Sequence, residues 1–287
     1  HRYPRDDGTY EYRVRKIETA ETCEVADMIA IGLKLADMGH DDCLDDVDRW
    51  IRNQFVENQM VDTGWVERLQ DSLDVIPMRK LSNDTREGPF DTTRSDYSPE
   101  RSTGNRVAER MVGCFAGWPL ANDLVAVATP GQQFPGHTFM NCCLGNGARA
   151  IYYAWEHILD FKDGTLSVNL LLNRASTWAD VNSHIPCEGR VDIHVKRKCH
   201  LEIRIPDWVE PDQVECRING KARELQFRGR YAVIGRTGKG NRVDLCFPIT
   251  ERSLKTRLGG RPYELIIRGN EVVSIDPPGK YYPYYQR

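Results

Sequence analysis

The sequence predicts a chain that is mainly α-helical in its first part and all-β in its second, with the change near residue 160. In the front half, apolar residues recur at the 3.6-residue spacing of a helix. From Gly164 onward, short runs such as "TLSVNLLL", "RVDIHV" and "HLEIRI" follow a period of two. Asn219-Gly220 stands between two such runs and signals a tight hairpin. Short strands at this spacing are typical of a β-sandwich, so we expect a helical domain over 1–160 and a β-sandwich domain over 161–287.

Three helices are predicted in the front half. The first covers residues 17–38, and Gly39 follows it as a C-terminal stop. The second runs from about Asp42 to Gln59, and the third begins near Gly147. The side chains that we expect the third helix to bury are Ala148, Ile151, Tyr152, Trp155, Ile158 and Leu159.

These three helices cannot form a closed helical domain by themselves, because each apolar face needs a partner. Residues 82–110 are polar and broken by Pro and Gly, which predicts a loop or an insertion. The chain opens with "HRYPRDDGTYEY", which is neither a signal peptide nor an ordinary initiator Met start. We therefore expect the missing partners to come from chain upstream of residue 1 or from another subunit.

Composition narrows the class of protein. The chain has 287 residues and a formal net charge of −3, a balance that favours neither a nucleic-acid partner nor an anionic membrane. No apolar run reaches the roughly 18 residues that a spanning helix needs. Nine cysteines without regular spacing argue against a disulfide framework. Free thiols favour a cytoplasmic location, and a secreted or periplasmic one stays open.

Two neighbouring cysteines, Cys142 and Cys143, stand directly before the third predicted helix. A disulfide between them would be strained, whereas thiolates and carboxylates are ordinary zinc ligands. The stretch "ETC" offers Glu21 and Cys23, which would complete a Cys₃Glu set. The spacing matches no common zinc finger, so buried structural cysteines are the alternative. Positions i and i+2 of a helix point apart, so Glu21 and Cys23 converge only if the backbone there is extended or Glu21 reaches around from the first turn.

Several stretches together resemble a known family: "ETCEVADMIAIGLKLADMG", "DDVDRWIRNQ", "CCLGNGAR" and a β-region with "RIPDW" and "INGK". They resemble the β-L-arabinofuranosidase family, glycoside hydrolase family 127, formerly called domain of unknown function 1680. Its members are zinc-dependent and pair an (α/α)₆ barrel with β-sandwich domains. The resemblance covers most of the chain outside 60–135. It implies that residues 1–160 are the C-terminal portion of the barrel domain and that residues 161–287 are a β-sandwich domain.

The resemblance also implies a mechanism. The residues that match the zinc ligands are Glu21, Cys23, Cys142 and Cys143, and Cys142 matches the catalytic nucleophile. Zn²⁺ keeps a thiol ionised at neutral pH, and a thiolate can attack an anomeric carbon to form a thioglycosyl intermediate. Water then releases the sugar with retained configuration. The expected substrate is a β-L-arabinofuranosyl or similar pentose residue of a plant-type glycan, and a homo-oligomer is possible.

A retaining glycosidase also needs a general acid/base, which in the family is a glutamate upstream of the "ETC" motif. None of the nearby carboxylates is a glutamate at the expected place, so this group is expected upstream of residue 1, or is displaced or absent. An alternative function therefore stays open: a catalytically incomplete relative that keeps zinc and binds carbohydrate or has a structural role. The nearby carboxylates are Asp6, Asp7, Glu11 and Glu18.

Three further residues lie near the cysteines in the sequence. His137 could reach the pocket, and the alternative is a loop histidine without a catalytic role. Asn146 and Arg149 match the family's pattern after the cysteines. We expect them to cap the helix, form a salt bridge there and thereby fix the cysteine loop.

Overall fold

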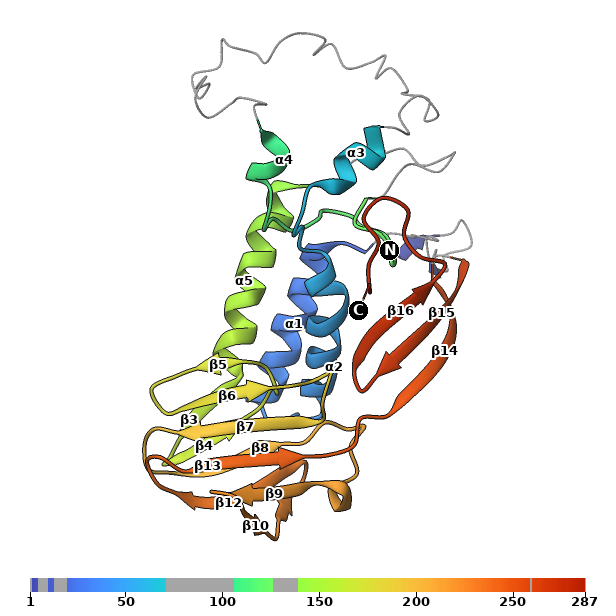
Figure 1. Ribbon diagram of the computed structural model, residues 1–287. Helices are drawn as coiled ribbons and strands as arrows, with labels where there is room; N and C mark the ends of the chain where they lie inside the picture. The colour runs from blue at the N-terminus through green and yellow to red at the C-terminus, as the bar shows by residue number, and fades with distance from the viewer. Residues whose placement is uncertain are drawn as a thin grey trace, which may run out of the picture.

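The computed structural model describes residues 2–4, 10–12, 20–70, 106–125, 139–258 and 260–286. A helical part precedes a region rich in β-sheet, as the sequence predicts (Figure 1). Among these residues no helix is long and apolar enough to cross a bilayer. The elements before the sheets are strands β1 (Arg2–Pro4) and β2 (Tyr10–Tyr12), helices α1 (Thr22–Asp37) and α2 (Cys43–Trp50), the π-helical turn η1 (Ile51–Phe55), and helices α3 (Gly64–Gln70), α4 (Val107–Arg110) and α5 (Asn141–His157).

Helices α1 and α5 lie side by side and run in the same direction. Near their N-terminal ends, the Sγ atoms of Cys23 and Cys143 are 3.3 Å apart. Near their C-terminal ends, His157 Nε2 and Asp37 Oδ1 are 3.4 Å apart. Helix α2 follows α1 after a short turn and packs back against it (Figure 1). The three helices therefore form one layer whose ends are fixed by side-chain contacts.

Two sheets follow α5 and lie near the C-terminal ends of α1 and α5 (Figure 1). One has six strands in the order β10-β9-β13-β7-β6-β5, and the other has five in the order β11-β12-β8-β4-β3. Buried residues of both sheets, such as Ile193 and Leu201, belong to one hydrophobic core together with α1, α2 and α5. The strands are β3 (Leu159–Lys162), β4 (Thr165–Val168), β5 (Arg174–Ala175), β6 (Ala179–Ser183), β7 (Arg190–Val195), β8 (Cys199–Arg204), β9 (Glu215–Ile218), β10 (Lys221–Arg223), β11 (Gln226–Arg228), β12 (Tyr231–Thr237) and β13 (Arg242–Cys246), with a 3₁₀ turn, η2 (Pro211–Gln213).

The predicted Asn219-Gly220 hairpin is confirmed. Ile218 of β9 pairs with Lys221 of β10, so these two residues alone form the turn. Their φ angles are 52° and 79°. Two consecutive positive φ angles are what a two-residue hairpin turn requires, and an Asn-Gly pair adopts them at low cost.

The last three strands form a sheet of their own. These strands, β14 (Glu251–Leu258), β15 (Arg261–Arg268) and β16 (Glu271–Asp276), pair only with one another among the described strands. Their buried side chains share a second core with Met60 and Leu124 of the helical part. The C-terminal tyrosines Tyr281, Tyr282, Tyr284 and Tyr285 complete this core. The sequence groups these strands with the other sheets, whereas the structure gives them a separate core.

The predicted helix limits hold in part. Glu21 is extended and α1 begins at Thr22, while η1 interrupts the second predicted helix, with Asn53 at φ −111° and ψ −109°. Helix α5 begins at Asn141, six residues before the predicted start at Gly147. Two glycines in "CCLGNGAR" lower helix propensity, and packing against α1 overrides that preference.

The buried face predicted for the third helix is confirmed at Ile158 and Leu159, which follow α5 directly, and is wrong at Ala148, Ile151, Tyr152 and Trp155. Ile151, Tyr152 and Trp155 are 45, 53 and 46% exposed. The face that α5 buries instead carries small residues, among them Gly147, Ala150 and Ala154. Small side chains let two helices approach closely, which explains why this face and not the larger apolar one packs inward.

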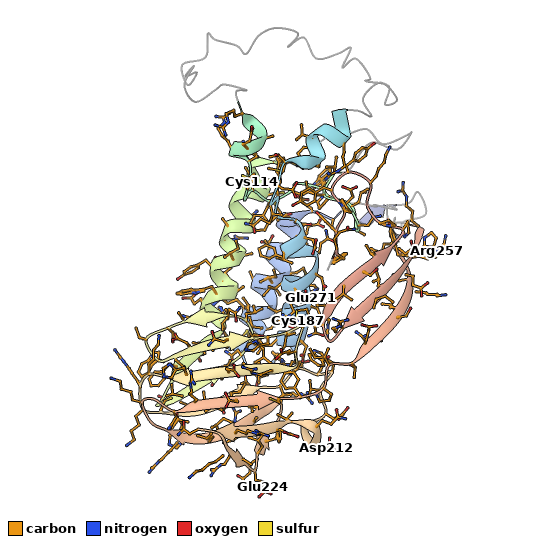
Figure 2. All side chains as sticks on the ribbon, in the orientation of Figure 1. Cys114, Cys187, Asp212, Glu224, Arg257 and Glu271 are labelled. Atoms are coloured by element: carbon orange, nitrogen blue, oxygen red, sulfur yellow. The ribbon has the colours of Figure 1, made fainter. Side chains whose placement is uncertain are left out.

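All nine cysteines, every one of them within the described residues, carry free thiols. They are dispersed through the fold: Cys114 lies near α4 at one end of the helical layer, and Cys187 lies toward the sheets at the other end (Figure 2). The strand-like patterns around Cys199, Cys216 and Cys246 predict small buried hydrophobic side chains. This is confirmed for Cys199 and Cys216 and wrong for Cys246, which is exposed.

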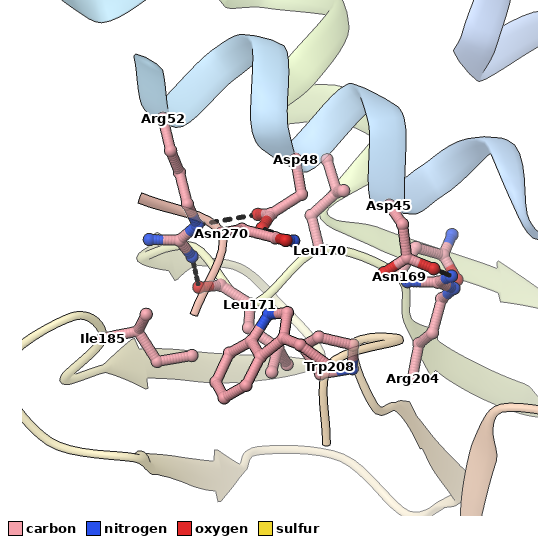
Figure 3. Close-up of a pocket in the computed structure, with 11 residues that line it drawn as sticks. Asp45, Asp48, Arg52, Asn169, Leu170, Leu171, Ile185, Arg204, Trp208 and Asn270 are labelled. Carbon is pink, nitrogen blue, oxygen red and sulfur yellow. Dashed lines mark hydrogen bonds and ion pairs between the residues drawn. The ribbon is translucent and has the colours of Figure 1, made fainter. Parts of the chain in front are cut away.

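Helix α2 is joined to two of the sheets by a buried network of charges (Figure 3). Asp45, 4% exposed, accepts hydrogen bonds from both terminal nitrogens of Arg204 of β8, which is 3% exposed. Asp48 Oδ2 accepts a bond of 2.9 Å from Asn270, in the turn between β15 and β16. Arg52 donates to the carbonyl of Leu171 at 2.6 Å. Because charges buried in this way are costly to leave unpaired, the network fixes α2 against both sheets.

Candidate metal centre

The four residues singled out in the sequence converge at one place. One ligand atom from each of Glu21, Cys23, Cys142 and Cys143 lies within 4.8 Å of all the others. Cys143 Sγ is 3.3 Å from Cys23 Sγ and 3.9 Å from Cys142 Sγ. Among the described residues, no other group of three or more His, Cys, Asp or Glu side chains has this arrangement.

Local backbone geometry explains how the "ETC" stretch presents two ligands to one point. Glu21 is extended, at φ −100° and ψ 126°, and α1 begins with the next residue. Cys23 is therefore in the first helical turn, while Glu21 is outside the helix. In a continuous helix these two side chains would point apart, and the extended backbone at Glu21 prevents this. An extended backbone is one of the two possibilities that the sequence left open.

A single segment joins the two helix starts. The backbone N–H of Thr22 donates to the carbonyl of Gly117 at 3.2 Å, and Ala20 N–H donates to Pro119 at 2.9 Å. Cys143 Sγ lies 3.6 Å from the same Gly117 carbonyl. Segment 117–119 therefore holds the start of α1 and also contacts the start of α5.

Further contacts fix α5 against α1. Arg149 Nη2 lies 2.6 Å from Asp27 Oδ1, which is the salt bridge expected of Arg149. Asn146 lies close enough to Cys23 to lower the pKa of its thiol. Both residues follow the cysteine pair in α5, and both contact side chains of α1. They therefore act between the two helices. The cap expected of them is wrong, because α5 begins at Asn141 and both residues lie inside the helix, whose N-cap residue is Met140.

Gly147 allows α5 to lie close to the segment before Gly117. A Cβ at this position would stand 2.4 Å from Cγ and Cδ2 of Phe115, a buried ring stacked on Phe55. We expect Gly147→Ala to lower the free energy of unfolding by about 1–3 kcal/mol, because the ring or the helix must move.

Gly145 provides the matched control for this substitution. It lies in the same helix, and a Cβ there meets nothing within 4 Å. Gly145→Ala is expected to be neutral or to stabilise by up to about 1 kcal/mol, since alanine is the better helix former. Urea unfolding of both variants checks the contrast, and equal midpoints would contradict it.

The surroundings of the cluster affect whether its sulfurs are protonated thiols or thiolates. Burial raises the pKa of the Cys143 thiol and, less strongly, that of Cys23, while the nearby Asn146 side chain opposes the shift at Cys23. The three cysteines also stand in the first turns of α1 and α5, where backbone N–H groups favour negative charge. Burial thus disfavours the thiolate forms of Cys143 and Cys23, and a bound cation would favour them.

The cluster is the right size for a zinc ion. A tetrahedron with Zn–S bonds of about 2.3 Å has sulfur–sulfur edges of about 3.8 Å. The two measured sulfur separations, 3.3 and 3.9 Å, lie on either side of that value. Three thiols and a carboxylate are also an ordinary zinc donor set.

Some residues considered in the sequence lie outside this description. Asp6, Asp7, Glu18 and His137 lie outside the described residues, and the side chain of Glu11 is not described within β2. The structure adds three fully buried residues that the sequence did not single out: Thr22, which stands between Glu21 and Cys23, and Asn58 and Tyr284, which are hydrogen-bonded to it in series. The position of Thr22 between two predicted ligands was the only available signal for this set.

Comparison with known proteins supports the family resemblance. Residues 166–249 match the family model described as "Beta-L-arabinofuranosidase, GH127 middle domain". No curated protein matches the chain. A GH127 β-L-arabinofuranosidase from Geobacillus stearothermophilus T6 is similar in fold, with a TM-score of 0.54 and 16% identity, over 94% of this chain and 39% of that one.

Two other solved structures show the same fold. A GH127 β-arabinofuranosidase gives a TM-score of 0.55 at 14% identity, covering 94% of this chain and 39% of its own. A structure described as a glycoside hydrolase gives 0.57 at 15%, covering 88% and 37%. The chain thus spans about two fifths of the length of these proteins. The predicted resemblance is confirmed: the chain is similar to the GH127 β-L-arabinofuranosidases, and the family-model match lies in its C-terminal part.

Proposed function

We propose that this chain is part of a zinc-dependent retaining glycoside hydrolase of the β-L-arabinofuranosidase type. The observation that carries the proposal is the convergence, within 4.8 Å, of ligand atoms from two segments about 120 residues apart. Neither the cluster of ligand atoms nor the family resemblance is enough by itself to assign a reaction. Together they support a carbohydrate substrate and a reaction at the sulfur cluster.

Each residue of the cluster has a role in this proposal. Glu21, Cys23, Cys142 and Cys143 would hold Zn²⁺, which would supply the positive charge that keeps the sulfurs ionised. Cys142 is the nucleophile, and it is the exposed member of the cysteine pair. Cys143 is buried, and its proposed role is that of a structural ligand which does not react.

The reaction follows from these roles. The Cys142 thiolate attacks the anomeric carbon, the glycosidic C–O bond breaks, and the leaving oxygen takes a proton from a general acid. Water then attacks the same carbon, the C–S bond breaks, and the sugar leaves with its original configuration. We assign the general acid to a residue outside the described part of the chain.

We also propose the finer architecture implied by the family. The parallel α1 and α5, with α2 returning beside α1, are consistent with the C-terminal portion of an (α/α)₆ barrel over residues 1–160. The exposed apolar stripe of α5, with Met28 and Ile31 of α1 at 46 and 53% exposure, would then be covered by further barrel helices. The six- and five-stranded sheets share one core, which supports a β-sandwich within residues 161–287.

Metal analysis tests the centre directly. The purified chain is expected to carry one zinc per molecule, measured by inductively coupled plasma mass spectrometry. The double variant Cys23→Ala/Cys143→Ala is expected to carry none, because it removes two of the four ligands. Cys199→Ala/Cys216→Ala removes two buried cysteines elsewhere and should retain the metal. Equal zinc in both double variants would remove the assignment.

A hydrolysis assay separates the enzyme from the alternative, a zinc-containing relative that binds carbohydrate or has a structural role. The full-length protein is expected to release the aglycone from an aryl β-L-arabinofuranoside. Zinc binding without any turnover would favour the alternative.

A further inference from the structure

A buried polar side chain lies between the two proposed ligands of α1. Thr22 is 0% exposed, although it stands between Glu21 and Cys23. Its hydroxyl lies 2.5 Å from the carbonyl of Ala116 and 2.9 Å from Asn58 Nδ2. A carbonyl can only accept, so the hydroxyl donates to Ala116 and accepts from the Asn58 amide.

The hydrogen bonds of the Asn58 side-chain oxygen agree with this orientation of the amide. Its Oδ1 accepts from the hydroxyl of Tyr284 at 3.0 Å and from Gln54 Nε2 at 2.6 Å. Asn58 and Tyr284 are both 0% exposed. Hydrogen bonds therefore run in one direction from Tyr284 through Asn58 and Thr22 to the Ala116 carbonyl. We call these three side chains the Thr22 network.

The network is connected to both halves of the sulfur cluster. Ala116 N–H donates to the carbonyl of Asn58 at 2.7 Å, so Asn58 holds Ala116 by backbone and, through Thr22, by side chain. The next carbonyl, that of Gly117, accepts from Thr22 N–H and lies 3.6 Å from Cys143 Sγ. Residues 116–117 thus stand between the start of α1, which carries Cys23, and Cys143 of α5.

Apolar packing alone would fill this space without the cost of burying three polar groups. A fully satisfied polar network differs from such packing because it fixes one arrangement of the segments that it joins. Here those segments are α1, the end of the second helical stretch, residues 116–117 and the C-terminal tail. The arrangement that they share determines where Cys23 stands relative to Cys143.

We propose that Thr22, Asn58 and Tyr284 are positioning residues that set the Cys23–Cys143 spacing and thereby the affinity of the centre for zinc. This inference rests on the proposed zinc centre, and it adds that the C-terminal tail takes part in it. None of the three side chains touches the metal or the substrate in this role.

Paired variants test the proposal on the whole chain. Thr22→Val removes the hydroxyl at nearly constant volume, Thr22→Ser keeps it, and Tyr284→Phe removes one oxygen at the far end of the network. Thr237→Val and Tyr231→Phe are matched controls in β12. Thr237 is a buried threonine whose hydroxyl donates to the Cys199 carbonyl, and Tyr231 is a buried tyrosine that donates to Asn169.

Two readouts are needed: zinc affinity, by competition with a chromophoric chelator, and the sulfur-to-cobalt charge-transfer spectrum of the Co²⁺-loaded protein. Thr22→Val is expected to weaken zinc binding by about 10- to 100-fold, as loss of groups that orient ligands does elsewhere. Tyr284→Phe is expected to weaken it less, and both should alter the Co²⁺ spectrum. Thr22→Ser and both β12 controls should keep the parental affinity and spectrum, even where the thermal midpoint falls.

The outcomes are distinct. If Thr22→Val and Tyr284→Phe lose stability like the controls but bind zinc like the parent, the network is only structural and the inference is overturned. If Thr22→Val fails to fold, Tyr284→Phe decides by itself. A parent chain that binds neither zinc nor Co²⁺ would instead overturn the proposed centre, and the role of the network with it.

Discussion

Replacing Cys142 with serine is expected to lower kcat of the full-length protein on an aryl β-L-arabinofuranoside by about 10⁴-fold or more, as removal of the nucleophile does in other hydrolases. A serine hydroxyl is far less ionised than a thiol at neutral pH and cannot replace the attacking sulfur. The steady-state rate and mass spectrometry of the protein measure the effect. With an electrophilic sugar, the parent should be labelled at Cys142 and the variant should not.

Cys187→Ser is the control for this experiment. Cys187 is also exposed, and it lies toward the sheets and away from the cluster (Figure 2). It should keep the parental kcat and the label on Cys142. Equal turnover by Cys142→Ser and the parent would exclude Cys142 as the nucleophile, even if the zinc centre were present.

The largest expected effect on stability is at the network of α2. Arg204→Leu should lower the free energy of unfolding by about 3–5 kcal/mol, because it leaves a buried Asp45 carboxylate without its charged partner. Within the described part of the chain, the Asp45 carboxylate accepts one further hydrogen bond, from the N–H of Asp207 at 3.0 Å, and this bond does not neutralise the charge. Urea unfolding followed by circular dichroism measures the loss.

Two further variants give this prediction its controls. Arg268→Leu removes an exposed ion pair, 2.9 Å to Glu251, whose side chains are 43 and 52% exposed. It should cost less than about 1 kcal/mol, because solvent screens exposed pairs. The double variant Arg204→Leu/Asp45→Leu should recover much of the loss, since it removes the stranded charge. An Arg204→Leu variant as stable as Arg268→Leu would show that burial is not what makes the pair matter.

The sequence predicts the composition of the candidate centre better than its surroundings. Thiols and a carboxylate have few other common functions in such a cluster, so residue type and family resemblance together point to Glu21, Cys23, Cys142 and Cys143. Their geometry depends on the extended backbone at Glu21, and the sequence could state that only as one of two possibilities. The roles of these residues remain predictions for the experiments above.

Other features could not be read from the sequence for physical reasons. Helix α5 begins at Asn141 because packing outweighs the poor helix propensity of Gly145 and Gly147, and packing is not a local property. The large apolar residues Ile151, Tyr152 and Trp155 predicted a buried face, whereas the residues that the helix buries are small. The sheet of β14–β16 has the same period of two as the other strands, so the hydrophobic pattern of the sequence could not predict its separate core.

The Thr22 network could not be predicted from the sequence, for a different reason. Its hydrogen bonds join residues that are 36, 94 and 226 positions apart. Threonine, asparagine and tyrosine are common in loops and on surfaces, so their types carry no signal of this arrangement.

These separations also affect how the protein matures during synthesis. The ribosome delivers Cys23 and Cys143 long before Tyr284, which closes the last of those hydrogen bonds. Contacts of such long range form late and slowly. Until the segment that carries Tyr284 has emerged from the ribosome, the surroundings of these thiols are therefore incomplete, and the sulfurs are more open to oxidants and to competing ions.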